Sequence, residues 1–427
     1  MQKIRSGQSF LYRKAGYDST ILEVKMKDKI RGDYLDAALN IAVQRFPYMT
    51  DKLVEKESVY YLHRDDISMN AVPTDKFRSL GSLATGYHLL DVTFTGDLIR
   101  IAFHHALCDG VGIKPFVETL VYYYCSLKYK KTFSKEGIHT VEEIPDKSET
   151  MEPYETTFFD VDKSKVTMVN SDGFALPETA SAPVACYRTQ IVVNQKEYVN
   201  TAKKYGATPG ILAAIFLSDV IYNLYPNADK PVVCSMAADL RAAIGMEQTH
   251  KNCTASIYLP YSATEANTDM TELAGIYKKL LSVQKSRDCA MDTLNKQIGL
   301  FNKVDTGETL EEKREMLSFF DKMCINTYVI SYLGKMQFND FGKYVESVHL
   351  YSNGIKGLTV NMVAAGDTIS FNMLQGFETD YYAKAFLAKL TEYDISYQST
   401  DIHPIVTGKD KSYITASRQA ERYFAQS

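Results

Sequence analysis

The sequence has no tryptophan, no cysteine pair in CxxC spacing and no long apolar run. Its seven cysteines are scattered, which argues against a structural zinc site or a redox motif and suits a reducing compartment. The longest apolar stretch, 211–224, is interrupted by Ser218 and Asp219 and is too short to span a bilayer. Residues 1–17 are polar and basic, without the apolar centre of a secretory signal. These absences predict a cytoplasmic protein with no membrane span and no metal site.

An excess of charge of either sign is also missing. Lysine and arginine number 48 against 52 aspartates and glutamates, and the isoelectric point is near 6.1. Nucleic-acid-binding proteins usually carry a basic face, so we expect no nucleic-acid partner. The 427 residues, 45% of them hydrophobic, are too many for one ordinary core. Two domains of about 200 residues each are expected.

The first part of the chain alternates helical and extended patterns. Apolar residues at helical spacing predict a helix over 35–46, which Pro47 ends. A short strand is expected at 59–63. The segments 88–95 and 98–105 flank Gly96-Asp97 and predict a β-hairpin. A second amphipathic helix is expected to begin after Gly110.

The second part of the chain repeats this coarse plan after a long polar connection at 130–183. Thr208-Pro209 predicts a helix start, with Thr208 as N-cap and Pro209 in the first turn. We therefore predict an α/β fold with mixed sheets, an N-terminal lobe at 1–165 and a C-terminal lobe at 184–427. Further strands are expected at 186–193, 231–238, 325–333, 358–363 and 368–374, and further helices at 195–205, 270–284 and 381–393.

The most informative segment is His104-His105-Ala106-Leu107-Cys108-Asp109-Gly110, directly after the apolar strand. The chain has only eight histidines, and two of them are adjacent here. Neutral imidazole has a pKa near 6.5, which suits a general base at neutral pH. If the strand stays regular to its end, His105 lies on its more apolar face and His104 on the other. The alternative is a satisfied core histidine at the end of a strand.

This segment resembles the HHxxxDG signature of the CoA- and carrier-protein-dependent acyltransferase superfamily. That superfamily includes chloramphenicol acetyltransferase, alcohol acetyltransferases and the condensation domains of peptide synthetases. The resemblance implies two chloramphenicol-acetyltransferase-like lobes that form a V with a substrate channel between them. It implies His105 as the general base and structural roles for His104, Asp109 and Gly110. A buried carboxylate needs a cation or donors, and Arg241 of Asp239-Leu240-Arg241 is the candidate partner of Asp109.

Other residues fit the resemblance less specifically. The alternative for Arg241 is a surface position, with Asp109 only capping the following helix. Asn252, Ser331 and Tyr332 are candidates for the channel wall and for stabilising an oxyanion, and Gln375 ends a strand that could border the channel. Relatives often have asparagine where this chain has Tyr332. Candidates for binding CoA phosphates at the channel mouth are Lys128, Lys130 and Lys131.

The implied reaction is acyl transfer from a thioester to a small hydroxyl or amine acceptor. The donor is acyl-CoA or an acyl- or peptidyl-carrier protein, whose phosphopantetheine arm is common to both, and no bound cofactor is expected. A nucleophilic role for Cys108 is a minor alternative, because it needs a base and an orienting group of its own. A non-catalytic module that recruits a carrier protein is the alternative from another class. The resemblance also implies a monomer.

Overall fold

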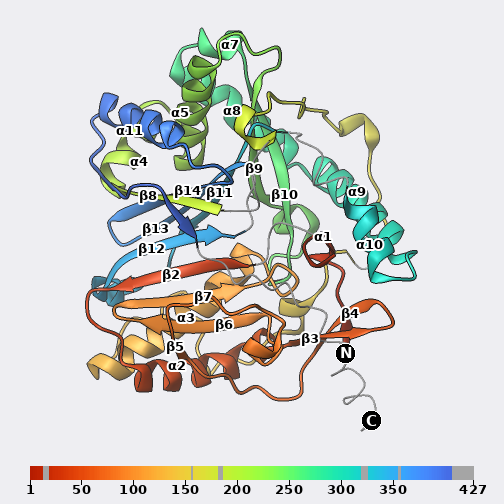
Figure 1. Ribbon diagram of the computed structural model, residues 1–427, viewed down its shortest axis with the longest axis vertical. Helices are drawn as coiled ribbons and strands as arrows, with labels where there is room; N and C mark the ends of the chain where they lie inside the picture. The colour runs from red at the N-terminus through yellow and green to blue at the C-terminus, as the bar shows by residue number, and fades with distance from the viewer. Residues whose placement is uncertain (13–18, 155–156, 181–185, 319–325, 354–356, 406–427) are drawn as a thin grey trace.

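The structure, a computed structural model, describes residues 1–12, 19–154, 157–180, 186–318, 326–353 and 357–405 (Figure 1). Within these residues the strands form two large mixed sheets and one small sheet. The predicted α/β fold class with mixed sheets is confirmed. Parts of the expected ranges, namely 155–156, 181–185, 406–427 and Ile325 of the strand expected at 325–333, lie outside the described residues.

The N-terminal sheet has the strand order β12-β2-β7-β6-β5. Two long helices, α2 and α3, pack against each other and cover one face of it (Figure 1). Their apolar stripes enter one hydrophobic core together with the inward residues of the strands. The bounds are β12 (Val345–Ser352), β2 (Thr20–Met26), β7 (Leu98–Phe103), β6 (Leu90–Thr95), β5 (Val72–Pro73), α2 (Gly32–Arg45) and α3 (Gly110–Tyr129).

The C-terminal sheet has the order β10-β9-β11-β13-β14-β8-β15, and β16 also pairs with β8. Strand β11 runs parallel to both β9 and β13, whereas the other pairs are antiparallel. Its strands are β10 (Thr254–Tyr261), β9 (Val232–Asp239), β11 (Tyr328–Lys335), β13 (Leu358–Ala365), β14 (Thr368–Gln375), β8 (Cys186–Asn194), β15 (Tyr397–Ser399) and β16 (His403–Ile405). Helices α4 (Gln195–Lys204), α5 (Pro209–Leu224), α8 (Met270–Gln284) and α11 (Tyr381–Glu392) lie with it in the upper part of Figure 1.

Smaller elements complete the described part of the chain. The small sheet joins β1 (Gln2–Lys3), β4 (Val59–His63) and β3 (Lys52–Lys56). Helix α9 (Arg287–Asp305) and helix α10 (Leu310–Leu317) run along one side of the molecule (Figure 1). The remaining helices are single turns, α1 (Gln8–Leu11), α6 (Arg241–Ile244) and α7 (Ala263–Ala266).

Strand β12 connects the two large sheets. Its residues fall inside the range 184–427 that was expected to form the C-terminal lobe, yet it pairs along its length with β2 of the N-terminal sheet. It also packs against β13 and β14. The expected C-terminal range therefore contributes strands to both sheets. The lobe boundaries and the V-shaped arrangement stay predictions.

Most of the elements expected from local patterns are present. The expected strand at 59–63 matches β4, the helix at 270–284 matches α8, and Thr208 caps α5 by accepting a hydrogen bond from the backbone N–H of Ile211. Helix α9 and strands β2, β10 and β12 were not expected. The strand expected to run to residue 105 ends at Phe103, with consequences for the site described below.

The described residues of the connection at 130–183 form irregular chain with short 3-10 turns at Lys147–Thr150, Lys163–Lys165 and Pro177–Ala180. It is anchored to both parts of the molecule. Glu149 accepts hydrogen bonds from Arg45 and Tyr48 on the N-terminal side. Glu178 accepts one from Tyr382 of α11. These contacts hold an otherwise irregular segment against the two sheets.

No single helix among the described residues is both long enough and apolar enough to cross a membrane. Helices α4 and α5, taken together, meet the two criteria of length and apolar composition. The pair is bent by 80° at its break.

Candidate functional site

The turn after β7 separates the two adjacent histidines. Because β7 ends at Phe103, His104 and His105 lie in a turn and not on a regular strand. His104 is fully buried, and its Nδ1 accepts a hydrogen bond of 2.9 Å from the backbone N–H of Ala106. His105 is only half-buried, and it lines a cavity. One histidine thus supports the turn and the other is open to a ligand.

Asp109 is fully buried and does not line the cavity. Its Oδ1 accepts from the N–H of Gly112 at 2.8 Å and from Nη2 of Arg241 at 2.7 Å. Its Oδ2 accepts from the N–H of Cys253 at 2.9 Å and from the hydroxyl of Thr254 at 3.0 Å. Burial raises the pKa of Asp109, but Arg241 and the N–H donors outweigh it, so that the pKa lies below its usual value. The carboxylate joins α3 to the turn between β9 and β10.

Arg241 is 2% exposed and contacts this carboxylate directly. The structure brings Asp109 and Arg241 together, and Asp109 also caps α3. The alternative of a surface position for Arg241 is therefore wrong. The other donors of Arg241 bind the carbonyls of Thr249 and Lys251, both at 2.7 Å. Its Nη1 binds Oδ1 of Asp239 at 2.8 Å. All five residues are therefore held in one rigid arrangement.

Two glycines allow close packing at the start of α3. A Cβ added to Gly110 would lie 3.2 Å from the side chain of Leu333, which is tight. A Cβ added to Gly112 would lie 2.0 Å from the backbone carbonyl oxygen of His250, which no side chain can tolerate. A structural role was expected for Gly110 and not for Gly112. The pattern Asp-Gly-Val-Gly contained the signal, but the partner of Gly112 lies far away in the sequence.

The cavity has a volume of about 550 Å³ and receives residues from both large sheets. Asn252, Ser331 and Tyr332, the candidates for the channel wall, line it together with Gly110 and His105. Burial raises the pKa of Tyr332. Unexpected lining residues come from α1 and α9, among them Phe10, Gln297, Leu300 and Phe301. Within the described residues, no three metal-binding side chains gather in one place.

Two expectations about the cavity are wrong. Gln375 does not line it, because its buried amide donates to the carbonyls of Phe377 and Thr379 and supports a turn. Lys128 and Lys131 lie at the far end of α3 from the histidine turn, and their amino groups bind the Lys29 carbonyl and the Tyr344 hydroxyl. A helix of 20 residues is about 30 Å long, so this lysine group cannot border the cavity mouth near His105.

The surroundings of His105 favour its neutral form. Burial lowers the pKa of His105 below its ordinary value, and the charge of Asp109 and the backbone of Cys108 only partly oppose this shift. The imidazole lies against the ring of Phe10, with 4.7 Å between the ring centroids, and beside Phe103. A neutral imidazole at neutral pH can accept a proton. His105 therefore meets the electrostatic requirement of a general base.

Cys108 lacks the features of a nucleophile. It is fully buried and is absent from the cavity lining. Burial and the nearby Asp109 raise the pKa of its thiol well above the usual value. A thiol held in its protonated form is a weak nucleophile.

The sequence matches no protein-family model and no curated protein. The structure resembles polyketide synthase associated protein 5 from Mycobacterium tuberculosis, with a TM-score of 0.61, 13% identity and coverage of 91% of this chain and 98% of that one. It resembles TRI101 of F. sporotrichioides, crystallised with coenzyme A and T-2, with a TM-score of 0.61, 12% identity and coverage of 92% and 99%. For the first condensation domain of the CDA synthetase the TM-score is 0.59, at 11% identity, with coverage of 92% and 95%.

The chain has the fold of these structures. The resemblance stated from the HHxxxDG segment is thus confirmed at the level of the fold, which is that of CoA-dependent acyltransferases and condensation domains. At identities of 11–13%, the similarity to these structures supports a conclusion about the fold and not about the activity. What the chain does must therefore be argued from the cavity and its residues.

Proposed function

We propose that the chain is an acyltransferase that moves an acyl group from a thioester to a hydroxyl or amine acceptor, with His105 as the general base. The observation that carries the proposal is the position of His105, a neutral imidazole in the wall of a cavity of about 550 Å³. A cavity of this size can hold the reacting ends of two substrates.

In the proposed reaction, His105 takes the proton of the acceptor while the acceptor oxygen or nitrogen attacks the thioester carbon. The carbon–sulfur bond then breaks, and the thiolate takes the proton back from the imidazole. Such proton transfer contributes about 10²–10⁴-fold to the rate. Holding donor and acceptor in one cavity supplies the rest, since effective molarities reach about 10⁵–10⁸ M.

The other site residues have supporting roles in this proposal. Asp109 and Arg241 hold the turn that carries His105, and His104 braces it through the backbone of Ala106. Ser331, Tyr332 and Asn252 line the same cavity and are the proposed donors to the oxyanion of the tetrahedral intermediate.

The donor is proposed to be acyl-CoA or a carrier-bound thioester. TRI101 was crystallised with coenzyme A, which supports the first choice through the shared fold. The described lining residues include no lysine or arginine, so the phosphates of CoA would lie outside the cavity. Only the uncharged pantetheine arm and the acyl group would enter it.

The test is thiol release from acyl-CoA donors of increasing chain length, with mixed alcohol and amine acceptors. We expect acceptor-dependent release that falls at least about a hundredfold in His105→Ala. The wild-type rate should fall as the pH drops through the pKa of His105, which lies below 6.5.

The control is His63→Ala on β4, outside the cavity lining, which should retain full activity. Equal release from wild type and His105→Ala would rule out His105 as the base. If wild type releases no thiol from any CoA donor, carrier-bound thioesters are the next substrates. If carrier-bound thioesters release no thiol either, the result would favour a module that only recruits a carrier protein.

A further inference from the structure

The cavity wall formed by the C-terminal sheet is polar. In β9 and β10 the register pairs Asp239 with Thr254. In β11 and β13 it pairs Ser331 with Asn361. All four line the cavity, and the two members of each pair share a face because residues opposite one another on paired strands point to the same side of a sheet. This polar wall presents a carboxylate, an amide and two hydroxyls to whatever lies in the cavity.

Apolar side chains from outside the C-terminal sheet also line the cavity, beside polar ones such as Ser9 and Gln297. The apolar ones come from α1, β7, α9 and the start of α3. These residues include Phe10, Phe103, Val111, Leu300 and Phe301. An acyl chain is stabilised against such a surface by burial of its methylenes. The polar wall is then left for the second substrate, the acceptor.

Asp239 is the only carboxylate among the described lining residues, and none of them is a lysine or arginine. Its side chain is 36% exposed. Oδ1 accepts from the backbone N–H and from Nη1 of Arg241, at 3.1 and 2.8 Å, whereas Oδ2 receives no hydrogen bond from a described residue. One oxygen of this carboxylate is therefore available to a ligand.

The charge of Asp239 is only partly balanced. Arg241 is the cation for two carboxylates, Asp239 and the fully buried Asp109. The three groups together carry one net negative charge, and Asp239 is the member of the three that faces the cavity. In a partly desolvated cavity this charge attracts cations and repels anions more strongly than it would in bulk water.

Asn361 supplies a second and independent observation. It is 4% exposed and lines the cavity, yet its amide makes no hydrogen bond with any described residue. The amide atoms are open to the cavity, where a ligand or an ordered water can bind them. The amide and the carboxylate lie in one wall, so a ligand that lies along this wall can bind both.

We propose that Asp239 determines acceptor specificity. The acceptor carries, beside the group that is acylated, a second N–H or O–H donor that binds Oδ2 of Asp239, and it carries no carboxylate or phosphate. Asn361 binds the same polar end of the acceptor. This inference rests on the proposed acyltransferase function and adds the class of its acceptor. A positively charged donor is favoured over a neutral one, because it adds the attraction between opposite charges to the hydrogen bond with the carboxylate.

The test uses four acceptors with one five-carbon skeleton: 5-amino-1-pentanol, 1,5-pentanediol, 1-pentanol and 5-hydroxypentanoate. For the wild type we expect kcat/KM to fall in this order. In Asp239→Asn the advantage of the amino alcohol over the diol should shrink about tenfold, and the hydroxy acid should gain. Asparagine keeps an oxygen for Arg241, so the positioning of Arg241 is preserved. Asn361→Leu should lower kcat/KM for the diol and the amino alcohol relative to 1-pentanol.

The matched control is Asp219→Asn, which removes a carboxylate paired with Lys389 at 2.8 Å but outside the cavity lining. It should leave the acceptor ranking unchanged. Ratios of kcat/KM among the four acceptors that are the same in Asp239→Asn as in wild type, or a wild-type preference for the hydroxy acid, would overturn the inference.

The same four compounds are also titrated against wild type and Asp239→Asn without any donor, with binding followed by ligand-observed NMR. If no donor releases thiol, the proposed function fails, while this binding order still decides the role of Asp239. If the relative affinities of the four compounds are the same in wild type and in Asp239→Asn, this result alone overturns the inference.

Discussion

Arg241 shows how a single side chain determines the geometry of the candidate site. It is 2% exposed, and its guanidinium binds two carboxylates and two backbone carbonyls. Lysine, with a compact ammonium group, could not reproduce this planar set of donors. Asp109 depends on it in turn, because a buried carboxylate without a cation is unstable.

Replacing Arg241 with methionine should therefore destabilise the protein strongly. The variant leaves Asp109 buried without its cation, and the expected loss is about 3–5 kcal/mol in the free energy of unfolding. Equilibrium denaturation measures it. Lys25→Met removes a half-exposed ion pair with Glu346 at 2.7 Å, and it should cost less than about 1 kcal/mol. Equal unfolding midpoints in the two variants would contradict the structural role of Arg241.

At the scale of elements, the start of α3 depends on one close backbone contact. The backbone N–H of Gly112 donates a hydrogen bond to Oδ1 of Asp109, which caps the helix. A Cβ added to Gly112 would collide with the backbone carbonyl of His250. Helix α3 can reach the turn between β9 and β10 only because this position has no side chain. The contact therefore sets the distance between the His105 turn and the polar wall.

Gly112→Ala tests this contact. Its Cβ would lie 2.0 Å from the His250 carbonyl oxygen, so we expect a lower melting temperature and loss of acyl transfer as α3 moves away. Gly275→Ala is the matched control, because Gly275 is exposed on α8 and its Cβ would meet nothing within 4 Å. Alanine there should stabilise the helix by about 0.5–1 kcal/mol. Destabilisation of the same size in both variants would show that the contact has no special role.

For the whole molecule, a buried polar cluster joins the two large sheets. Glu23 of β2 accepts from Arg100 of β7 at 2.8 Å, and Arg188 of β8 lies 3.9 Å from its other oxygen. Arg188 also binds Asn372 of β14 and lies 3.7 Å from the ring centre of Tyr351 on β12. Charged groups that neutralise one another across a junction fix its register, since any shift would leave them unpaired.

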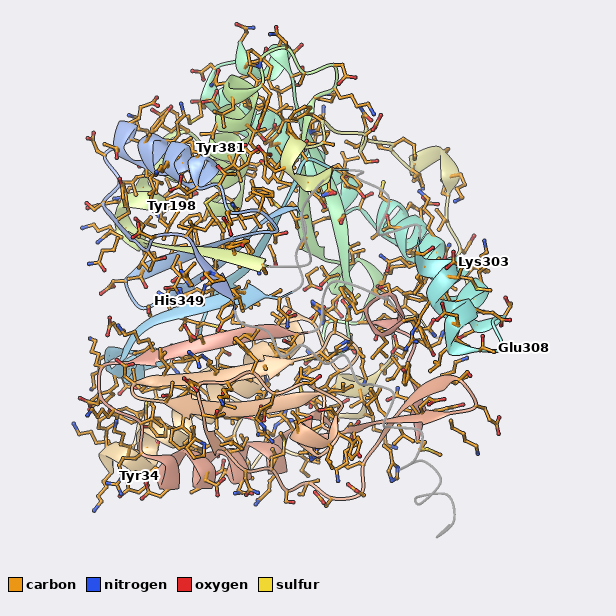
Figure 2. The ribbon with its side chains drawn as sticks, viewed as in Figure 1. Tyr34, Tyr198, Lys303, Glu308, His349 and Tyr381 are labelled. Atoms are coloured by element: carbon orange, nitrogen blue, oxygen red, sulfur yellow. The ribbon has the colours of Figure 1, made fainter. Side chains whose placement is uncertain are left out.

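His349 on β12 lies at this junction, as Figure 2 shows, and makes stability depend on pH. Burial, and next the charge of Arg188, lower its pKa to about 4. The unfolded chain binds a proton there below about pH 6.5, and the folded chain does so only below about 4. The free energy of unfolding should thus fall, by up to about 3 kcal/mol from this residue, as the pH drops through that window.

Denaturant titrations at pH 7.5, 5.5 and 4.5 measure the effect. In His349→Gln the free energy of unfolding should depend less on pH in this window than in wild type. His403→Gln, on β16 at the edge of the C-terminal sheet, serves as the control and should follow wild type. Parallel pH curves for wild type and His349→Gln would contradict the assignment.

Much of the fold could be predicted from the sequence because it follows from local patterns. Pro47 ends a helix and Thr208 begins one through interactions within a few residues. The second hairpin, β13 and β14, follows from alternation and a glycine turn. Helix α9 was not expected, although its buried residues Met291, Leu294, Ile298 and Phe301 fall at helical spacing and the sequence therefore contained the signal.

The sequence by itself determined which residues are candidates for the chemistry: adjacent histidines after a strand, an acid, a glycine and a distant Asp-Leu-Arg. Tertiary structure alone decided which of them meet. It turned His105 into the cavity after Phe103, placed Gln375 away from it, and brought Asp239 and Asn361 into one wall. The reason is physical: hydrogen-bond caps and side-chain periodicity act over a few residues, whereas strand order and close backbone contacts depend on packing between segments far apart in the chain.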